Sequence, residues 1–392
     1  MEKNHIRTET LGEPKDHLGF YLEHAISPVH QDISNLSRHM ERRNSLYRYL
    51  GLPRGYITGK KILEVGPASG HNSLYVATCQ PEQLDLLEPN PVAVREINAL
   101  YKHFNLPHTT PNVIKKTLEE FETDQNYDIV ICEAWLGISD HERGLMKKLA
   151  GSVKKEGIFV TTLASPVGWF FNMVRRFLAN LIFFTDDDFD EKSKKLLISF
   201  GPHLSTLKDM SCPQIDWVQD SLLNPGFLTM HPSPGMFIKD VGQDYSIYNS
   251  YPRFSSDWRW YKSLYEEKKK FNKVFIDNFL KNIHNFLDYR FVFDQRSSML
   301  NAELEQLCFE FRNVVKMFED QKNNNSISQA VVIIDKVKQN IASLKSPLEK
   351  SIDEVLNVIK TNKIDTETIS QMKYFKKCFG RELFYVSVLR DN

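Results

Sequence analysis

A glycine-containing segment and a later acidic residue have the types and spacing of a ligand-binding site. The segment Glu64-Val65-Gly66-Pro67-Ala68-Ser69-Gly70 directly follows an apolar run, and Glu88 ends the next apolar run. Gly66 and Gly70 allow positive φ and a close approach of the backbone to a ligand. A carboxylate at position 88 offers two acceptors to two neighbouring hydroxyls, such as those of a ribose. The pattern therefore predicts a site for a ligand that contains a nucleoside.

The same segment does not have the glycine spacing of a dinucleotide-binding loop. The pattern G-x-G-x-x-G/A fails, because Ala68 stands two residues after Gly66 and His71 three residues after that. A dinucleotide also places its pyrophosphate at an open helix N-terminus. The carboxylate of Glu64 suits an ammonium group far better than a pyrophosphate. The segment therefore favours a cofactor such as S-adenosylmethionine over a nicotinamide dinucleotide.

Short apolar runs alternate with helical patterns around this segment. We expect strands at 61–65, 84–88, 113–116, 127–132 and 157–162, and helices at 71–77, 92–104 and 141–153. Strands that alternate with helices at this spacing predict βαβ units and a doubly wound parallel sheet. Right-handed crossovers then bring the C-terminal ends of the strands, and with them the ligand, to one edge of the sheet.

With these residues the chain resembles the class I S-adenosylmethionine-dependent methyltransferases. Their first motif is a strand that ends in acid-x-Gly-x-Gly-x-Gly, and their second strand ends in an acid. This chain matches at Glu64, Gly66, Gly70 and Glu88, and it departs at Ala68, where the family usually has glycine. An alanine fits there if it keeps a negative φ. The resemblance implies an α/β, Rossmann-like methyltransferase sheet, S-adenosylmethionine as the cofactor and methyl transfer as the activity.

The resemblance also implies roles for individual residues. Glu64 and Gly66 would hold the methionine part of the cofactor, and Glu88 would hold the ribose. Glu133, which ends the fourth strand, would face the sulfonium. The other residues expected around the cofactor are Leu118 and Glu119 in the loop that meets the adenine, together with Pro67, Ala68, Ser69, Gly70, His71, Asn72, Pro89, Asn90 and Trp135.

The sequence pattern divides the chain into five parts. We expect residues 1–58 to form a helical lid, with a helix over 18–50, and residues 59–165 to form the cofactor-binding core. We expect residues 166–254 to form a substrate region of helices and loops, with a sixth strand at 245–251. We expect residues 255–375 to form a large helical insertion, in which the polar run 321–328 is a loop. The last segment, 376–392, contains a strand pattern at 382–389, and the resemblance implies that this is the final core strand, antiparallel to the others.

Candidate catalytic residues follow from the chemistry of methyl transfer. The reaction is an in-line displacement, so alignment supplies much of the rate, and a hydroxyl acceptor also needs a base. His141 is the first candidate base, because it follows the fourth strand by one short loop and histidine titrates near neutral pH. Glu133 is the second predicted catalytic residue. The competing interpretation of His141 is a solvated histidine at a helix N-terminus. His24, His30 and His39 lie in the predicted lid, where a structural role is the commoner one.

Aromatic and charged residues give two candidate acceptor contacts. Arg43 adds positive charge to the lid and can meet a phosphate-bearing acceptor. Asp257, Trp258 and Arg259 lie in an aromatic segment that can stack on a sugar ring and hydrogen-bond its hydroxyls. The competing interpretations are a solvated helix face and an anchor for the helical insertion. This segment and the His-Asn that follows the glycines are similar to bacterial methyltransferases of surface-polysaccharide type. That resemblance implies O-methylation of a small-molecule or saccharide acceptor.

Two other functions stay open at this point. Glu133 and Glu142 bracket a loop that contains Trp135 and Gly137. Protein arginine methyltransferases have a similar loop, in which two glutamates at this spacing grip a guanidinium. The chain lacks that family's tyrosine-rich first helix and its Thr-His-Trp loop. The other open function is a non-catalytic binding module, in which the helices from Tyr261 onward recruit a partner.

Composition disfavours several classes of protein. Fifty basic and fifty acidic residues leave no net charge, which argues against a nucleic-acid binder. The five cysteines form no C-x-x-C pair, so we predict neither a metal site nor a disulfide framework. The polar N-terminus has no apolar signal core. Two arginines interrupt the apolar run 167–184, which indicates a buried or amphipathic helix with membrane-surface contact as the lesser alternative. We expect a soluble, cytoplasmic protein.

Overall fold

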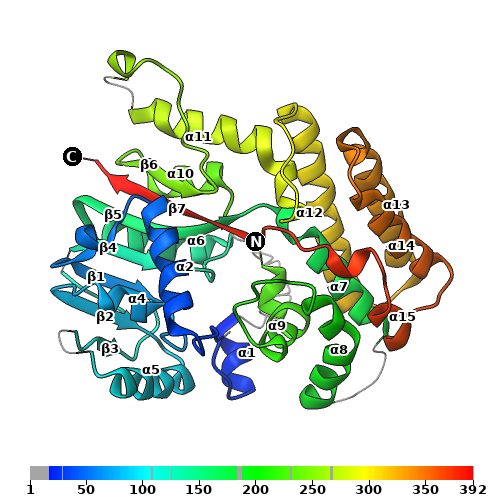
Figure 1. Ribbon diagram of the computed structural model, residues 1–392, viewed down its shortest axis with the longest axis horizontal. Helices are drawn as coiled ribbons and strands as arrows, with labels where there is room; N and C mark the ends of the chain where they lie inside the picture. Colours follow the sequence, from blue (N-terminus) through cyan, green and yellow to red (C-terminus); the bar gives the residue numbers. More distant parts are fainter. Residues whose placement is uncertain are drawn as a thin grey trace, which may run out of the picture.

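A seven-stranded sheet occupies the left half of the computed structural model in the view of Figure 1. The strand order is β3-β2-β1-β4-β5-β7-β6. Strand β7 is antiparallel to both of its neighbours, and the other adjacent strands pair in parallel. The structure describes residues 17–28, 30–106, 109–124, 126–182, 188–229, 232–264 and 268–391.

The helices and strands have the following bounds. The strands are β1 (Lys61–Val65), β2 (Gln83–Leu87), β3 (Asn112–Ile114), β4 (Tyr127–Cys132), β5 (Val153–Ala164), β6 (Tyr245–Tyr251) and β7 (Leu383–Arg390). The helices up to β6 are α1 (His17–Glu23), α2 (Leu36–Tyr49), α3 (Arg54–Ile57), α4 (Ser73–Thr78), α5 (Pro91–Phe104), α6 (Asp140–Gly151), α7 (Pro166–Ile182), α8 (Phe189–Leu204), α9 (Gln214–Val218), the π-helical turn η1 (Gln219–Leu223) and α10 (Pro234–Val241). The later helices are α11 (Lys268–Asn282), α12 (Ser298–Asp320), α13 (Asn324–Ile341), α14 (Leu348–Lys360) and α15 (Thr366–Ser370).

Different helices cover the two faces of the sheet, because alternate residues of a strand point to opposite sides. On one face, Ile62 and Ile129 pack in an apolar cluster with residues of α2, α3 and α4. On the other face, Leu63 and Val130 belong to a larger cluster that contains α6 and α7 and continues into the later helices. The central strands are therefore buried on both faces, which explains why their sequences are continuous apolar runs.

Strand β7 brings the end of the described chain between β5 and the edge strand β6. Its residues Phe384, Val386 and Val388 are at most 1% exposed. Since β7 is antiparallel to both neighbours, β6 runs parallel to β5, and its C-terminal end reaches the same sheet edge as those of β1 and β4. The helices between β6 and β7 gather mainly on the right of Figure 1, beside α7 and α8. The predicted α/β sheet, with an antiparallel last strand, is confirmed.

Helix α7 contains the apolar run with two arginines and is buried within the protein. Arg175 and Arg176 are 0% and 2% exposed. Arg176 donates from Nε and Nη2 to the carboxylate of Glu319 at 2.6 and 3.0 Å, and the guanidinium carbon of Arg175 lies 3.7 Å from the ring centroid of Phe379. The arginines thus connect α7 to α12 and to the segment before β7. Within the described ranges, no helix combines the length and apolar character needed to cross a membrane.

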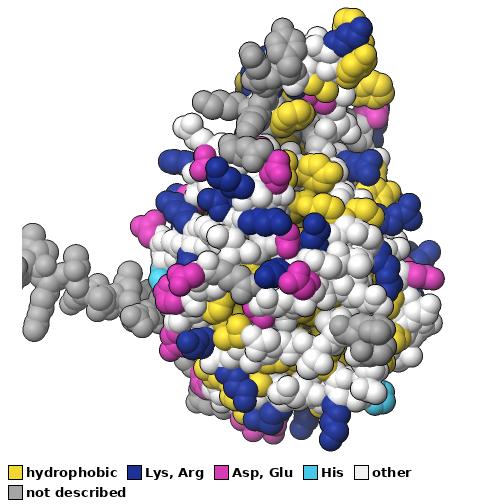
Figure 2. Space-filling view, turned by 90° about the vertical axis from the view of Figure 1, so that its left-hand side faces the viewer, with side chains coloured by type: hydrophobic (Ala, Val, Ile, Leu, Met, Phe, Trp, Pro, Cys, Tyr) yellow, Lys and Arg dark blue, Asp and Glu magenta, His cyan; other side chains and the backbone are white. Residues whose placement is uncertain are grey.

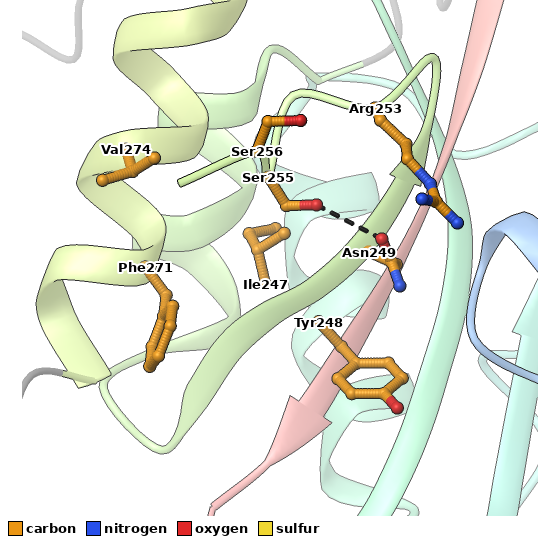
Figure 3. Close-up of a pocket in the computed structure, with 8 residues that line it drawn as sticks. All are labelled: Ile247, Tyr248, Asn249, Arg253, Ser255, Ser256, Phe271 and Val274. Atoms are coloured by element: carbon orange, nitrogen blue, oxygen red, sulfur yellow. Dashed lines mark hydrogen bonds between the residues drawn. The ribbon is translucent and has the colours of Figure 1, made fainter. Parts of the chain in front are cut away.

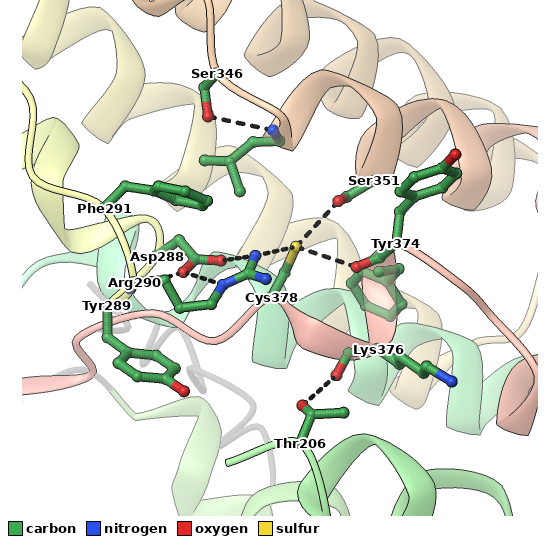
Figure 4. Close-up of polar contacts among 12 residues, drawn as sticks. Thr206, Asp288, Tyr289, Arg290, Phe291, Ser346, Ser351, Tyr374, Lys376 and Cys378 are labelled. Carbon is green, nitrogen blue, oxygen red and sulfur yellow. Dashed lines mark hydrogen bonds and ion pairs between the residues drawn. The ribbon is translucent and has the colours of Figure 1, made fainter. Parts of the chain in front are cut away.

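A buried polar cluster holds the segment before β7 against the helical insertion (Figure 4). Arg290 donates to both carboxylate oxygens of Asp288, at 2.9 and 2.8 Å, and to the sulfur of Cys378 at 3.5 Å. The Cys378 thiol donates to the Ser351 hydroxyl at 3.1 Å. Burial raises the pKa of Cys378 to about 11. The thiol therefore stays protonated at neutral pH and acts as a hydrogen-bonding part of the core.

Two helical regions differ from their predicted extents. Residues 18–50 form two helices, α1 and α2, which are separated by a non-helical segment. The polar run 321–328 is a loop only as far as Asn323, because the Asn323 side chain accepts a hydrogen bond from the Ser326 N–H and begins α13 at Asn324. Asparagine is common in loops, but it is also one of the best residues at a helix N-cap.

Candidate functional site

The loop between β1 and α4, residues 66–72 and called the glycine loop below, lies at the C-terminal edge of the sheet. Gly66 and Gly70 adopt positive φ, at 69° and 78°. A Cβ atom on Gly66 would lie 2.8 Å from the Trp135 indole, which donates from Nε1 to the Val65 carbonyl at 3.2 Å. Only glycine fits at position 66, because the indole covers this side of the loop and the backbone is left-handed.

Ala68 corrects one prediction about this loop. Its φ is 52°, so the residue lies in the left-handed region and not at the negative φ expected for alanine. For a residue with a Cβ, that conformation costs roughly 1–2 kcal/mol. The backbone N–H of Ala68 donates to Glu88 Oε2 at 3.0 Å. This contact helps to hold the strained residue in place.

Glu88 follows β2 directly and braces the glycine loop. Its side chain is 3% exposed, and its two oxygens accept hydrogen bonds from the N–H groups of Ala68 and Asn90, at 3.0 and 2.9 Å. Burial raises the pKa of Glu88 to about 7, against the two hydrogen bonds that lower it. Asn90 caps α5 by accepting from the Val92 N–H and donates to the carbonyl of Ile26 in the N-terminal region.

Glu64 supplies a second buried carboxylate to the site. It is 5% exposed, and its Oε2 atom has no hydrogen-bond partner in the described part of the chain. Burial and the neighbouring carboxylate of Glu133 raise the pKa of Glu64 to about 7. An unpartnered buried carboxylate oxygen is costly. An ammonium group that donates to this atom would remove the cost and lower the pKa again.

Arg43 of α2 and Glu133 after β4 form a buried ion pair at the same edge. The guanidinium donates from Nη1 and Nη2 to the two carboxylate oxygens, at 3.1 and 2.6 Å, and from Nη2 to the Tyr47 hydroxyl at 3.3 Å. The exposed fractions of the side chains are 7% for Arg43 and 11% for Glu133. Arg43 was predicted to meet an acceptor and Glu133 to face the sulfonium, and the structure brings the two together.

Residues 24–28 and 30–43, called the lid segment below, contact the glycine loop through histidines. The backbone N–H of Gln31 donates to His71 Nδ1 at 3.1 Å, and His39 Nε2 donates to the His71 carbonyl at 2.9 Å. Burial lowers the pKa values of His39 and His71, so both are neutral at pH 7. His30 lies between Asp216 of α9, at 2.8 Å, and Glu96 of α5, at 3.2 Å. The lid segment therefore covers one side of the loop.

His30 should make the lid contact dependent on pH. Its hydrogen bond with Asp216 is the largest effect that raises its pKa, which reaches about 9 despite partial burial. A histidine whose pKa is raised on folding stabilises the fold fully below its unfolded value near 6.5 and loses that contribution as the pH rises through about 9. We expect the difference in melting temperature between wild type and His30→Gln to shrink between pH 6.5 and 9. A difference that is constant over this range would show that His30 is not charged in the fold.

His141 lies at the surface. Its Nε2 atom is 2.7 Å from Glu119 Oε1, and its side chain is 65% exposed. Leu118, next to Glu119, is 3% exposed and belongs to the core. An exposed imidazole that is paired with an exposed carboxylate has little of the enclosure that a general base uses, so the geometry favours the solvated-histidine interpretation.

The Glu142 carboxylate forms hydrogen bonds with the loop that precedes its own helix. Its Oε1 atom accepts from the Gly137 N–H at 3.0 Å, and its Oε2 atom accepts from the N–H and hydroxyl of Ser139. The Ser139 hydroxyl accepts in turn from the Glu142 N–H, which completes a capping box at the start of α6. Glu133 and Glu142 therefore do not form a free pair of acceptors for a guanidinium.

The remaining predicted residues divide between the glycine loop and the segment that follows β6. Pro67, Ser69 and Asn72 lie in the glycine loop and Pro89 follows Glu88; Pro67 and Ser69 are buried. Asp257, Trp258 and Arg259 follow β6 and are in no described contact with the glycine loop. Arg259 binds Asp257 at 2.6 Å, and Trp258 is 98% exposed. In the described ranges, no group of three histidine, cysteine, aspartate or glutamate side chains is placed to hold a metal ion.

The contacts that two residues make in the site were not predicted from the sequence. Tyr385 of β7 lies beside Arg43 and Glu133, and its burial and the nearby carboxylate raise its pKa above the usual value. Asp216 of α9 anchors His30. A tyrosine in a strand and an aspartate in a short helix carry no local signal of such a role, since both positions depend on how distant elements pack.

The arrangement of the strands decides the fold family. The sheet is that of the class I methyltransferase fold. No protein-family model and no curated protein matches the sequence. The fold assignment therefore depends on the order and direction of the strands themselves.

Similar solved structures are methyltransferases at low identity. Magnesium protoporphyrin IX methyltransferase from Synechocystis PCC 6803, with bound S-adenosylmethionine, is 17% identical with a TM-score of 0.28, over 32% of this chain and 59% of that one. The N-methyltransferase NodS from Bradyrhizobium japonicum WM9, in complex with S-adenosylhomocysteine, is 20% identical with a TM-score of 0.28, over 34% and 65%. The CcbJ methyltransferase from Streptomyces caelestis is 13% identical with a TM-score of 0.25, over 40% and 51%. The matches span less than two thirds of each of these neighbours, and likenesses this distant carry no argument about activity.

Proposed function

We propose that the protein is an S-adenosylmethionine-dependent methyltransferase. The observation that carries the proposal is the sheet edge at which two buried carboxylates, Glu64 and Glu88, flank the glycine loop. The chain has the strand order of the class I fold, and its ligand edge has one buried acid near the end of the first strand and another directly after the second. The residues of the loop also fail the spacing that a dinucleotide needs.

The groups at this edge fit the cofactor. Glu64 Oε2, which is buried and has no hydrogen-bond partner among the described residues, suits the methionine ammonium. Each Glu88 oxygen accepts one backbone hydrogen bond and keeps acceptor capacity for a ribose hydroxyl. Arg43 and Glu133 neutralise each other at the end of β4, where a sulfonium then meets no net charge. When it is bound, S-adenosylmethionine supplies a methyl group on a positively charged sulfur.

We infer further that the acceptor is a small molecule or a saccharide that is methylated on oxygen. The resemblance to surface-polysaccharide methyltransferases supports this acceptor. The contacts of Glu133 and Glu142 also weigh against an arginine acceptor, because a planar guanidinium is best held by two free carboxylates in its plane. Here the Glu133 carboxylate binds Arg43, and the Glu142 carboxylate binds Gly137 and Ser139.

Calorimetric titration with S-adenosylmethionine tests the proposed function. We expect saturable binding of S-adenosylmethionine and of S-adenosylhomocysteine, and no binding of NAD⁺ under the same conditions. A folded protein that binds neither sulfur compound would favour the non-catalytic binding module. Binding of NAD⁺ alone would mean that the interpretation of the glycine loop is wrong.

Three substitutions separate the roles of Glu133, Glu142 and His141. Glu133→Gln leaves the Arg43 charge buried without its partner, so we expect a loss of about 3–5 kcal/mol in the free energy of unfolding. Glu142→Gln weakens a capping box and should cost roughly 1 kcal/mol. His141→Ala should change neither stability nor cofactor affinity. Chemical denaturation and calorimetry measure these effects. A marked loss of affinity in His141→Ala would instead place this histidine at the cofactor.

A further inference from the structure

A cavity of about 320 Å³ lies against the free edge of β6, apart from the glycine loop (Figure 3). Its volume is at the lower end of the range for small-molecule sites. Phe271 and Val274 extend from α11 towards the strand on one side, and Tyr248 and Arg253 lie on the other (Figure 3). The cavity is lined by Ile247, Tyr248, Asn249, Arg253, Ser255, Ser256, Phe271 and Val274.

Two asparagines of α11 fix the walls of this cavity. Asn272 accepts from the Ile247 N–H at 2.7 Å and donates to the Tyr245 carbonyl at 3.1 Å. Asn278 donates to the carbonyls of Phe254 and Ser256, both at 2.9 Å. The helix is thus tied to the strand and to the loop that follows it, so the cavity is formed in advance. Because Asn272 occupies groups of the strand edge, the edge is not open to an extended peptide.

The lining combines aromatic faces with hydrogen-bond donors. Tyr248 and Phe271 are 47% and 38% exposed, so parts of both rings are available for stacking. Asn249 accepts from the Ser255 hydroxyl at 3.2 Å through its side-chain oxygen, and its NH₂ group has no partner among the described residues. In the same described ranges, Arg253 contacts the Tyr49 ring at 5.0 Å and pairs with no carboxylate. Among the described residues, no acidic side chain lines the cavity.

More aromatic residues are exposed close to this cavity in the chain. Trp258, Trp260 and Tyr261 follow the loop and are 98%, 64% and 70% exposed. The ammonium group of Lys262 lies 4.9 Å from the Trp260 ring centroid. Figure 2 shows hydrophobic side chains, with both basic and acidic side chains between them, in the upper part of the molecule. These residues offer further flat apolar surfaces beside a site rich in donors.

We propose that the cavity between β6 and α11 binds one unit of an acidic saccharide. Aromatic rings pack on the apolar face of a sugar ring, the Asn249 amide and the serine hydroxyls bond its hydroxyls, and Arg253 binds its carboxylate or phosphate. The described lining offers a guanidinium and no carboxylate, which disfavours a cationic ligand.

The C-terminal end of β6, beside the cavity, lies at the same end of the sheet as the glycine loop. Tyr251 at the end of β6 contacts Tyr49 of α2, with ring centroids 5.0 Å apart, and α2 also carries Arg43. One helix thus connects the cavity to the candidate cofactor site. That the saccharide is a distal part of the methyl acceptor rests on the proposed function, whereas saccharide binding itself does not.

Calorimetric titration without S-adenosylmethionine tests the proposal. The probes are alginate and hyaluronan tetrasaccharides, which are acidic, and maltotetraose, which is neutral. We expect at least one acidic probe to bind with at least tenfold higher affinity than maltotetraose. Binding of S-adenosylmethionine in a separate titration reports on the proposed function, so either result can fail alone. If neither acidic probe binds, or if all three bind equally, the saccharide site is wrong. Binding only to phosphatidylglycerol vesicles would assign the surface to a membrane and overturn the proposal.

Substitutions at exposed positions link the binding to this cavity. Arg253→Gln should lower the affinity for the acidic probe by about tenfold or more, because it removes one charged hydrogen-bond donor. Ser256→Trp should abolish binding by filling the cavity, and the melting temperature should stay at the wild-type value in both variants. Lys262→Gln removes one positive charge outside the cavity and should leave the affinity unchanged within twofold. An equal loss in Lys262→Gln and Arg253→Gln would show general charge attraction and would overturn the site.

Discussion

A chain that ends before Glu382 is expected not to reach a cooperative native state. The deletion removes β7 from between β5 and β6, and therefore leaves the backbone groups of both neighbours without partners. It also removes Phe384, Val386 and Val388, which are almost fully buried. Replacing one large buried side chain by alanine lowers the free energy of unfolding by about 2–5 kcal/mol. Three such losses together are comparable to the whole free energy of unfolding of a typical domain, which is about 5–15 kcal/mol.

Circular dichroism during heating measures this effect against a graded control. Phe384→Ala keeps the strand and loses one side chain, so it should melt cooperatively at a lower temperature. The truncated chain should show no cooperative transition. A truncated chain with the wild-type melting temperature would mean that the segment is not part of the sheet in solution.

Glu88→Ala is expected to abolish measurable binding of S-adenosylmethionine. The substitution removes the acceptor for two ribose hydroxyls and leaves the N–H groups of Ala68 and Asn90 without their partner. Loss of a charged hydrogen-bond acceptor should cost about 2–4 kcal/mol of binding free energy, or roughly 30- to 1000-fold in affinity. Because Glu88 also holds Ala68 at its positive φ, the melting temperature should fall as well.

Two further variants keep this prediction specific. Glu88→Gln retains the shape but presents an NH₂ group to one backbone N–H, so it should bind the cofactor nearly as poorly as Glu88→Ala. Glu82→Gln removes a mostly exposed carboxylate that is paired with Lys61 before β2, and it should leave the affinity unchanged. Wild-type affinity in a folded Glu88→Ala protein would contradict the cofactor assignment.

The strands were the most predictable part of the fold. The predicted ranges 127–132 and 245–251 agree with β4 and β6, and the last strand was placed within one residue of β7 at both ends. Strands that are buried on both faces are continuous apolar runs. The start of α13 was placed too late, because its asparagines form an N-cap only when the chain turns into a helix.

The candidate site was predictable only where one short segment carries it. Glu64, the two glycines and Glu88 are close in sequence, and the parallel strands must bring their ends to one edge. The pairing of Arg43 with Glu133 spans 90 residues, and no local pattern encodes it. Glu142 has the spacing of an arginine-binding glutamate, but the local geometry of residues 137–139 uses its carboxylate instead.

The sequence by itself determined the alternation of strands and helices, the acid-flanked glycine loop and the place of the last two strands, because periodicity and backbone freedom are local properties. Only the tertiary structure decided which carboxylates stay free. Burial leaves Glu64 Oε2 without a partner, while packing gives Glu133 to Arg43 and His30 to Asp216. It also decided that Ala68 is left-handed, since the brace from Glu88 comes from the neighbouring strand. These features depend on the distance between groups that are remote in the chain, and folding alone sets that distance.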